Sequence, residues 1–278
     1  MMKEEYRIPL TAMVGGVAAL VLRIWNLRTG FEAGTGLPVS GSPSFPALLV
    51  LQALVLLALW VQARRLSDHG NPRFPFRADG PALRVLPVAG AFLLTLSGAA
   101  DVFEGLSGLN LRALLSGAPS YGYAYPGLIA GESVGMSAGV QCASGCLTLL
   151  SAWAVFACVQ ACAGHALPFR ALVLVPAVSM AFRLVTVYRI DSVNPVLEDY
   201  APALVALLFH VLGFYVFSAF LFDSGDLRQF AVSAGGAVTL ALCVLTDESD
   251  YISAPLMFCG SAAALAGFLM LALQAPRS

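Results

Sequence analysis

Eight apolar runs, each of about twenty residues, constrain the fold of this chain more than any other feature. They lie near residues 8–27, 44–63, 85–103, 141–163, 169–188, 201–222, 228–246 and 254–274. Only 11% of the residues are charged and 59% are hydrophobic, which is not typical of a soluble globular protein. Inside a bilayer each run must be helical, because its backbone groups have no water to bond. The sequence therefore predicts an all-α integral membrane protein with eight transmembrane helices, and residues 1–278 form a single membrane domain.

The distribution of basic residues predicts the orientation. Of the fifteen lysines and arginines, ten fall in the two terminal segments and the loops on their side, three in the opposite loops, and two inside apolar runs. Cytoplasmic loops carry such an excess of basic residues, so both termini are predicted to be cytoplasmic. The first run carries Arg23 and lacks a small-x-small cleavage site, so we interpret it as an uncleaved span rather than a signal peptide.

Arg23 and Arg183 are the two basic residues inside apolar runs, and their surroundings are alike. A guanidinium at the centre of a membrane helix costs about 3 kcal/mol, and less near its ends. Each arginine shares a helical face with residues at matching positions, shifted by 160: Gly16, Ala19 and Asn26 in the first case, Pro176, Ser179 and Thr186 in the second. The match suggests an internal repeat.

Further matches extend this repeat. Pro46 and Pro202 begin the second and sixth runs in the same tripeptide, Pro-Ala-Leu, and Asp101 and Asp247 close the third and seventh. The halves would be residues 1–165 and 166–278, two four-helix repeats that run the same way through the membrane, as in some transporters. Chance similarity among helices rich in alanine and leucine is the alternative, and it stays open.

The two arginines and two aspartates suggest chemistry. All four are expected near the outer ends of their helices, at one depth of the membrane. In one interpretation they form interhelical ion pairs, or the arginines extend to the headgroups. In the other they line a polar pocket open to the outside, where a guanidinium fork binds a small anionic solute.

Other residues give weaker indications. His210 lies near the middle of the sixth run and is either a proton relay or a neutral hydrogen-bonding residue. All six cysteines lie in predicted spans, and the pairs Cys142/Cys146 and Cys158/Cys162 have helical i,i+4 spacing, which suits packing better than disulfides or metal ligation. We predict no metal, no cofactor and, at a net charge of −1, no nucleic-acid partner.

The long outer connection from Glu104 to Val140 carries two overlapping G-x-S-x-G strings, around Ser133 and Ser137. That motif serves hydrolases only in a strand-turn-helix elbow, and no strand is predicted here. We therefore predict no catalytic residue. The tyrosine-rich part of the connection is expected to lie at the bilayer interface or to form a lid over an outer cavity, and the Gly/Ser-rich residues 127–140 are the candidate for a partly re-entrant segment.

One resemblance adds to this picture. Residues 182–200, FRLVTVYRIDSVNPVLEDY, resemble segments of multi-spanning bacterial membrane proteins without an assigned function. The resemblance covers about a tenth of the chain and implies a location in the bacterial plasma membrane, but no activity.

The function predicted from the sequence is that of a transporter or permease for a small solute, with an outward-facing polar site. Arg23, Arg183, Asp101 and Asp247 are its candidate residues, and His210 is a candidate proton relay. Two alternatives stay open: a non-catalytic membrane component of a partner complex, and a membrane-embedded enzyme. The lipid bilayer is the one partner that composition alone implies.

Overall fold

A computed structural model describes residues 6–32, 37–66, 72–76, 82–108, 137–192, 196–247 and 252–275. These residues are helical apart from their connections and one isolated bridge between Phe31 and Pro38. The long helices are α1 (Arg7–Thr29), α2 (Ser44–Arg64), α3 (Ala82–Gly108), α5 (Ala138–Cys162), α6 (Val175–Asp191), α7 (Leu197–Ala219), α8 (Leu227–Val244) and α9 (Ser253–Gln274). Two short 3-10 helices, η4 (Arg170–Leu174) and η5 (Phe220–Phe222), extend α6 and α7.

All eight predicted spans are confirmed as helices long and apolar enough to cross a bilayer. Their bounds differ from the predicted runs by a few residues, because polar residues at the ends can continue a helix. The largest difference is in α6: the fifth run begins as the 3-10 turn η4, and the α-helix starts at Val175, just before Pro176. Proline is favoured at the first positions of a helix because its missing N–H would have no partner there.

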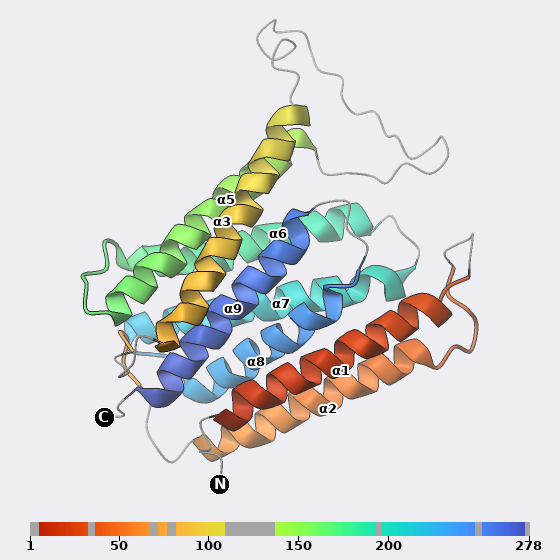
Figure 1. Cartoon of the computed structure of the whole chain (residues 1–278), viewed down its shortest axis with the longest axis horizontal. Helices are drawn as coiled ribbons and strands as arrows, with labels where there is room; N and C mark the ends of the chain where they lie inside the picture. The colour runs from red at the N-terminus through yellow and green to blue at the C-terminus, as the bar shows by residue number, and fades with distance from the viewer. Residues whose placement is uncertain are drawn as a thin grey trace, which may run out of the picture.

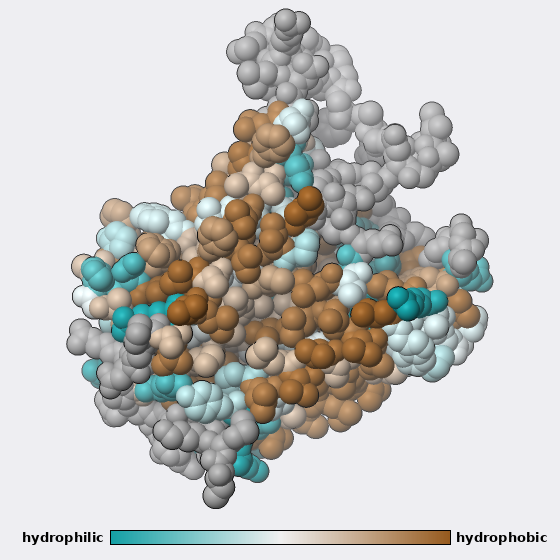
Figure 2. Space-filling model, in the orientation of Figure 1, coloured by the Kyte–Doolittle hydropathy of each residue, from teal (hydrophilic) through white to brown (hydrophobic). Residues whose placement is uncertain are grey.

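Successive long helices run in alternating directions (Figure 1). Consequently, α1 begins and α9 ends at the same end of the bundle, which we call the terminal end. Apolar side chains cover the middle of the visible face, and hydrophilic ones gather towards both ends (Figure 2). This distribution is the one expected of helices surrounded by hydrocarbon.

The two C-terminal helices form the centre of the bundle. In the most apolar stretch of α8, 78% of the residues are buried, and in α9 72%, against 22% in α2 and 33% in α1. α8 packs against α1, α2, α7 and α9, whereas α1 and α2 lie at one edge (Figure 1). Most of the surface of α2 is therefore available to lipid.

Glycines allow α3 to lie very close to the helices on either side of it. A Cβ atom at Gly90 would lie 2.6 Å from the Gly260 carbonyl oxygen of α9, and one at Gly98 would lie 2.9 Å from the Gly145 carbonyl oxygen of α5. Apolar side chains gain little from leaving lipid, so membrane helices associate mainly through such close van der Waals contact. Small residues thus position α3, which carries Asp101.

The connection between α2 and α3 contributes to the core at the terminal end. Phe76 is fully buried, and its ring meets Phe220 at 5.3 Å and Phe74 at 5.6 Å. Edge-on and stacked contacts extend the cluster to Phe217, Phe230 and Phe268. The arginines of this connection were counted in the prediction of orientation; the buried Phe76 and the partly buried Phe74 also hold the connection against the bundle.

Candidate functional site

The faces predicted around the two arginines are confirmed. In α1 the buried residues include Gly16, Ala19, Arg23 and Asn26, and in α6 they include Pro176, Ser179, Arg183 and Thr186. Arg23 is completely buried, and Arg183 is 4% exposed. Both guanidinium groups therefore lie inside the bundle, and neither extends to the headgroups.

Arg23 joins three parts of the chain at the end opposite the termini. Its Nε donates to Asp247 Oδ1 at 2.6 Å, just beyond α8, and its Nη1 donates to Asn26 Oδ1 at 2.9 Å. Nη1 also donates to the Glu198 carbonyl at 3.1 Å, and Nη2 to the Asp199 carbonyl at 2.6 Å, in the first turn of α7. Four hydrogen bonds thus offset the desolvation of this buried cation.

A proline explains why α7 offers a carbonyl to this arginine. Pro202 lies four residues after Glu198 inside the helix and has no N–H to donate back to the Glu198 carbonyl. That oxygen needs another donor, and Arg23 supplies it. The predicted Pro-Ala-Leu match at Pro46 and Pro202 thus coincides with a contact that holds α7 to α1.

Asn26 extends the cluster towards α2. Its Nδ2 donates to Ser44 Oγ at 3.0 Å, and the Ser44 hydroxyl lies 2.9 Å from that of Ser42. Gly30 packs directly against these groups: a Cβ atom at this position would lie only 2.6 Å from Asn26 Nδ2. The first turn of α2 is therefore tied to the same guanidinium.

Among the described residues, Asp247 finds a partner for one of its two oxygens. Oδ1 binds Arg23, while Oδ2 is buried and has no hydrogen-bond partner among the described residues. The side chain is 19% exposed. Burial raises the pKa of this carboxyl to about 6, since the loss of hydration outweighs the attraction of Arg23. The group therefore titrates close to neutral pH.

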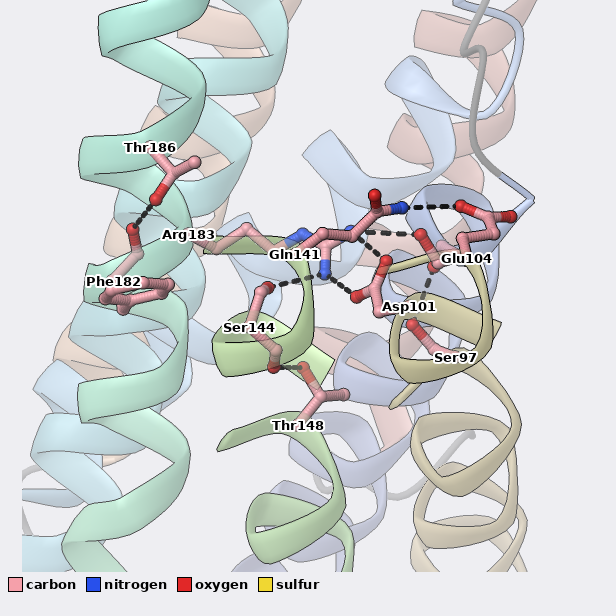
Figure 3. Close-up of polar contacts among 10 residues, drawn as sticks. Ser97, Asp101, Glu104, Gln141, Ser144, Thr148, Phe182, Arg183 and Thr186 are labelled. Atoms are coloured by element: carbon pink, nitrogen blue, oxygen red, sulfur yellow. Dashed lines mark hydrogen bonds and ion pairs between the residues drawn. The ribbon is translucent and has the colours of Figure 1, made fainter. Parts of the chain in front are cut away.

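Arg183 forms the second pair, with both oxygens of Asp101 (Figure 3). Its Nη1 also donates to Ser144 Oγ of α5 at 3.1 Å, and its Nη2 to Ser253 Oγ of α9 at 3.2 Å. The guanidinium thus reaches from α6 to three other helices. Bidentate geometry is the strongest form of arginine–carboxylate contact.

Other hydrogen bonds support this second cluster. Ser97 Oγ donates to the Ser253 carbonyl at 2.7 Å, one helical turn from Asp101. Near the cluster, Gln141 Nε2 donates to Glu104 Oε2 at 2.7 Å and links α5 to α3 (Figure 3). The polar groups of the Arg183–Asp101 cluster are therefore bonded to one another, and we call the cluster closed. Both oxygens of Asp101 accept from Arg183, and two serine hydroxyls accept from the same guanidinium.

The four candidate residues form two separate pairs rather than one site. Each pair joins an arginine from one predicted half to an aspartate from the other: α1 with the end of α8, and α6 with α3. The pairing is reciprocal, but the surroundings differ. Arg23 binds backbone carbonyls of α7, whereas Arg183 binds two serine hydroxyls. The repeat itself stays a prediction.

His210 lies apart from both pairs. It is fully buried, its Nδ1 lies 2.7 Å from the Ala206 carbonyl one turn earlier, and its ring meets Phe258 edge-on at 5.7 Å. Its Nε2 has no hydrogen-bond partner among the described residues. A proton relay needs a second group within hydrogen-bond reach, and the described part of the chain places none beside Nε2.

The cysteines are unpaired in the described residues, and five of the six are buried or partly buried while Cys146 is exposed. Cys243 Sγ accepts a hydrogen bond from Gln52 Nε2 at 3.4 Å. Among the described residues, no group of three or more histidines, cysteines or carboxylates is arranged to hold a metal ion. Ser133 and the tyrosines of the outer connection lie outside the described residues.

Sequence reasoning did not find several residues of these clusters. Ser144 and Ser253 give no signal, because serines are common in membrane helices and carry no distinctive spacing. The Glu198 and Asp199 carbonyls were not predicted as partners of an arginine. One signal was present: Pro202, four residues after Glu198, has no N–H, so the Glu198 carbonyl lacks its usual donor within the helix. A cavity at the terminal end, between α2, α7 and α8, was also not anticipated.

The helices and the buried pairs define the class of this protein as an all-helical, multi-pass membrane protein. Comparison with protein-family models, with curated proteins and with solved structures finds no match to the chain. Any proposal about its function must therefore rest on the chemistry of its own residues.

Proposed function

We propose that this protein is a transporter or permease for a small solute, and that the Arg23–Asp247 pair is the titratable closure of its outer side. The observation that carries the proposal is the unequal use of Asp247, whose Oδ1 binds a buried guanidinium while its Oδ2 is buried without a described partner. An ion pair that only held helices together would be more stable if both carboxylate oxygens accepted hydrogen bonds, as those of Asp101 do.

Protonation gives this pair two states. In the closed, buried arrangement the pKa of Asp247 is about 6, so the carboxyl keeps its proton at mildly acidic pH, and loss of that proton towards pH 7 favours an open arrangement in which the carboxylate is hydrated and leaves Arg23. Arg23 also holds the first turn of α7 through two carbonyls. Opening the pair would therefore loosen α1, α7 and the end of α8 together. Such a bistable element is what a proton-coupled transporter needs at its outer side.

The solute class follows from the guanidinium. In the closed arrangement Arg23 is fully buried, so a solute in the surrounding water does not reach its guanidinium. Once released from Asp247, its planar fork would suit a carboxylate or a phosphate. We therefore propose a small anionic solute that replaces Asp247 as partner of Arg23. The location in the bacterial plasma membrane, the cytoplasmic termini and the parallel repeat belong to the same proposal.

Transport assays in proteoliposomes test this function. Uptake of acetate, lactate, succinate, glutamate and inorganic phosphate would be measured at external pH 5.5 and 7.5. We expect at least one anion to be taken up, faster at the higher pH. Asp247→Asn should remove the pH dependence, and Arg23→Gln should abolish uptake while the protein stays folded and inserted.

Glu104→Gln is the matched control, because Glu104 is a carboxylate near the other pair that binds only Gln141 among the hydrogen bonds given above. It should keep both the uptake and its pH dependence. No uptake of any of these anions at either pH, in protein of verified fold, would contradict the proposal. So would an Asp247→Asn protein whose uptake keeps its full pH dependence.

A non-catalytic membrane component of a partner complex is the second candidate function. The closed Arg183–Asp101 cluster favours it, because a satisfied ion pair shut off from solvent acts as a clamp between helices and not as a binding site. In that case neither pair affects transport, and the substitutions lower stability alone. An embedded enzyme has less support, since no serine or carboxylate of the described residues lies beside His210 Nε2.

A further inference from the structure

A cavity of about 620 Å³ lies at the terminal end of the bundle, between α2, α7 and α8. Its walls are apolar over most of their length and include Trp60 of α2, Phe209, Leu212 and Val216 of α7, and Val232 of α8. Trp60 is 43% exposed and Leu212 40%. Since these exposed apolar side chains belong to membrane helices, the cavity opens sideways towards the lipid.

The packing of the three helices makes this cavity a blind groove. α2 and α7 each pack against α8, which forms the floor. The three helices pack tightly at Gly236, where a Cβ atom would lie 2.4 Å from the Phe209 ring and 3.0 Å from Leu56, and we infer that the groove ends there. Gly236 lies eight residues after Arg228 along α8, or about 12 Å at 1.5 Å per residue. This length fits within one leaflet, about 15 Å of hydrocarbon.

Two arginines form the mouth of the groove. Arg64, at the end of α2, lies with its guanidinium carbon 3.6 Å from the centre of the Trp60 ring, which holds the cation beside the apolar wall. Arg228 lies in the first turn of α8 and is exposed. The acidic residue at the mouth, Asp226, accepts from the Arg228 backbone N–H at 2.9 Å as the cap of α8. Among the residues that line the cavity, two arginines stand against one carboxylate, so the net charge of these lining residues is positive.

We propose that this groove binds one anionic phospholipid, with its phosphate at Arg64 and Arg228 and one acyl chain along Phe209, Leu212 and Val232. Charge complementarity selects the occupant: cations at the membrane surface end of the groove meet an anionic headgroup, and an apolar wall of leaflet depth meets a chain. A zwitterionic lipid offers the same chain but no net charge. The inference rests on the membrane class alone and is independent of the proposed transport.

Tryptophan fluorescence with brominated lipids tests the inference. Of the three tryptophans, Trp25 and Trp153 are replaced by phenylalanine, so that Trp60 alone reports contact with bromine. The protein is reconstituted with brominated phosphatidylglycerol or brominated phosphatidylcholine at equal mole fractions, in an otherwise unbrominated bilayer. Quenching of Trp60 then gives the relative association constant of the two lipids at the groove.

We expect phosphatidylglycerol to be preferred, by about fivefold for each arginine that contacts it. Arg64→Gln with Arg228→Gln should reduce the preference to near one. Quenching is normalised to each variant without bromine, because removing Arg64 also changes the surroundings of the indole. Both arginines are exposed, and circular dichroism verifies the fold.

Arg65→Gln with Arg170→Gln is the charge-matched control, since both are exposed arginines that do not line the cavity. It should keep the preference. Equal quenching by the two lipids in the parent protein would overturn the inference, because an acyl chain alone would then occupy the groove. An equal loss of preference in the control would also overturn it, since diffuse surface charge would suffice.

Discussion

Removal of the Asp101 charge tests how the second pair contributes to stability. Asp101 and Arg183 are only 1% and 4% exposed, and the guanidinium binds both carboxylate oxygens. Asp101→Asn leaves one acceptor oxygen and no charge, so that the buried guanidinium loses its counter-ion. Breaking a buried ion pair from one side costs about 3–5 kcal/mol. The bonds to Ser144 and Ser253 remain, so we expect a loss near the lower limit.

The double substitution Arg183→Met with Asp101→Leu distinguishes the loss of the whole ion pair from the loss of one charged partner. It removes both charges and fills the space with apolar groups, which is often neutral or stabilising for buried pairs. We expect its free energy of unfolding to lie within about 2 kcal/mol of the parent. The losses of the two single variants of this cycle, Arg183→Met and Asp101→Leu, should together exceed the loss of the double variant, and the difference is the coupling free energy.

Unfolding in mixed micelles with increasing sodium dodecyl sulfate, followed by circular dichroism, measures these free energies. Glu104→Gln is the control on the same helix, and it should cost less than about 1 kcal/mol because Glu104 is only partly buried. If Asp101→Asn costs as little as this control, or if the single losses simply add, the pair does not hold the helices as argued.

Three further predictions concern other parts of the bundle. The pKa of Asp247 is raised from 3.8 to about 6, so the native state binds the proton more tightly than the unfolded state does. The stability of the parent relative to Asp247→Asn should therefore fall by about 2 kcal/mol between pH 4 and pH 7, and parallel stability curves would refute this. Gly90→Ala should destabilise by about 1–3 kcal/mol in the same unfolding assay, while Gly139→Ala, with open space around it, should not. Phe76→Ala should cost about 3–5 kcal/mol and Phe169→Ala, at 69% exposure, less than about 0.5, as judged from unfolding midpoints.

Much of the fold could be predicted because hydrocarbon leaves the backbone few choices. Any apolar run of sufficient length must be helical in a bilayer, and the eight runs are all found as helices. The same reasoning made Arg23 and Arg183 conspicuous, since a charge among apolar residues needs a partner. Asp101 and Asp247 were the acidic residues at matching helix ends, and both are found bound to an arginine.

What the pattern left undecided was which arginine binds which aspartate, and whether the four meet. That depends on helix packing, which local spacing does not encode. α3 can carry Asp101 to Arg183 because Gly90 and Gly98 let it lie against its neighbours, and a glycine in a sequence does not state which helix it will meet.

The sequence by itself therefore determined the class of the protein, the number of spans and the helical faces of both arginines. These follow from the period of the helix and the cost of exposing polar groups to lipid, and both are local properties of the chain. The tertiary structure alone decided that the four charged residues form two pairs. One pair is closed, and the other leaves an oxygen of Asp247 without a described partner. The tertiary structure also decided that a groove with a basic mouth lies at the terminal end. These depend on contacts between residues far apart in the chain, where sub-ångström differences in packing decide which polar atoms meet.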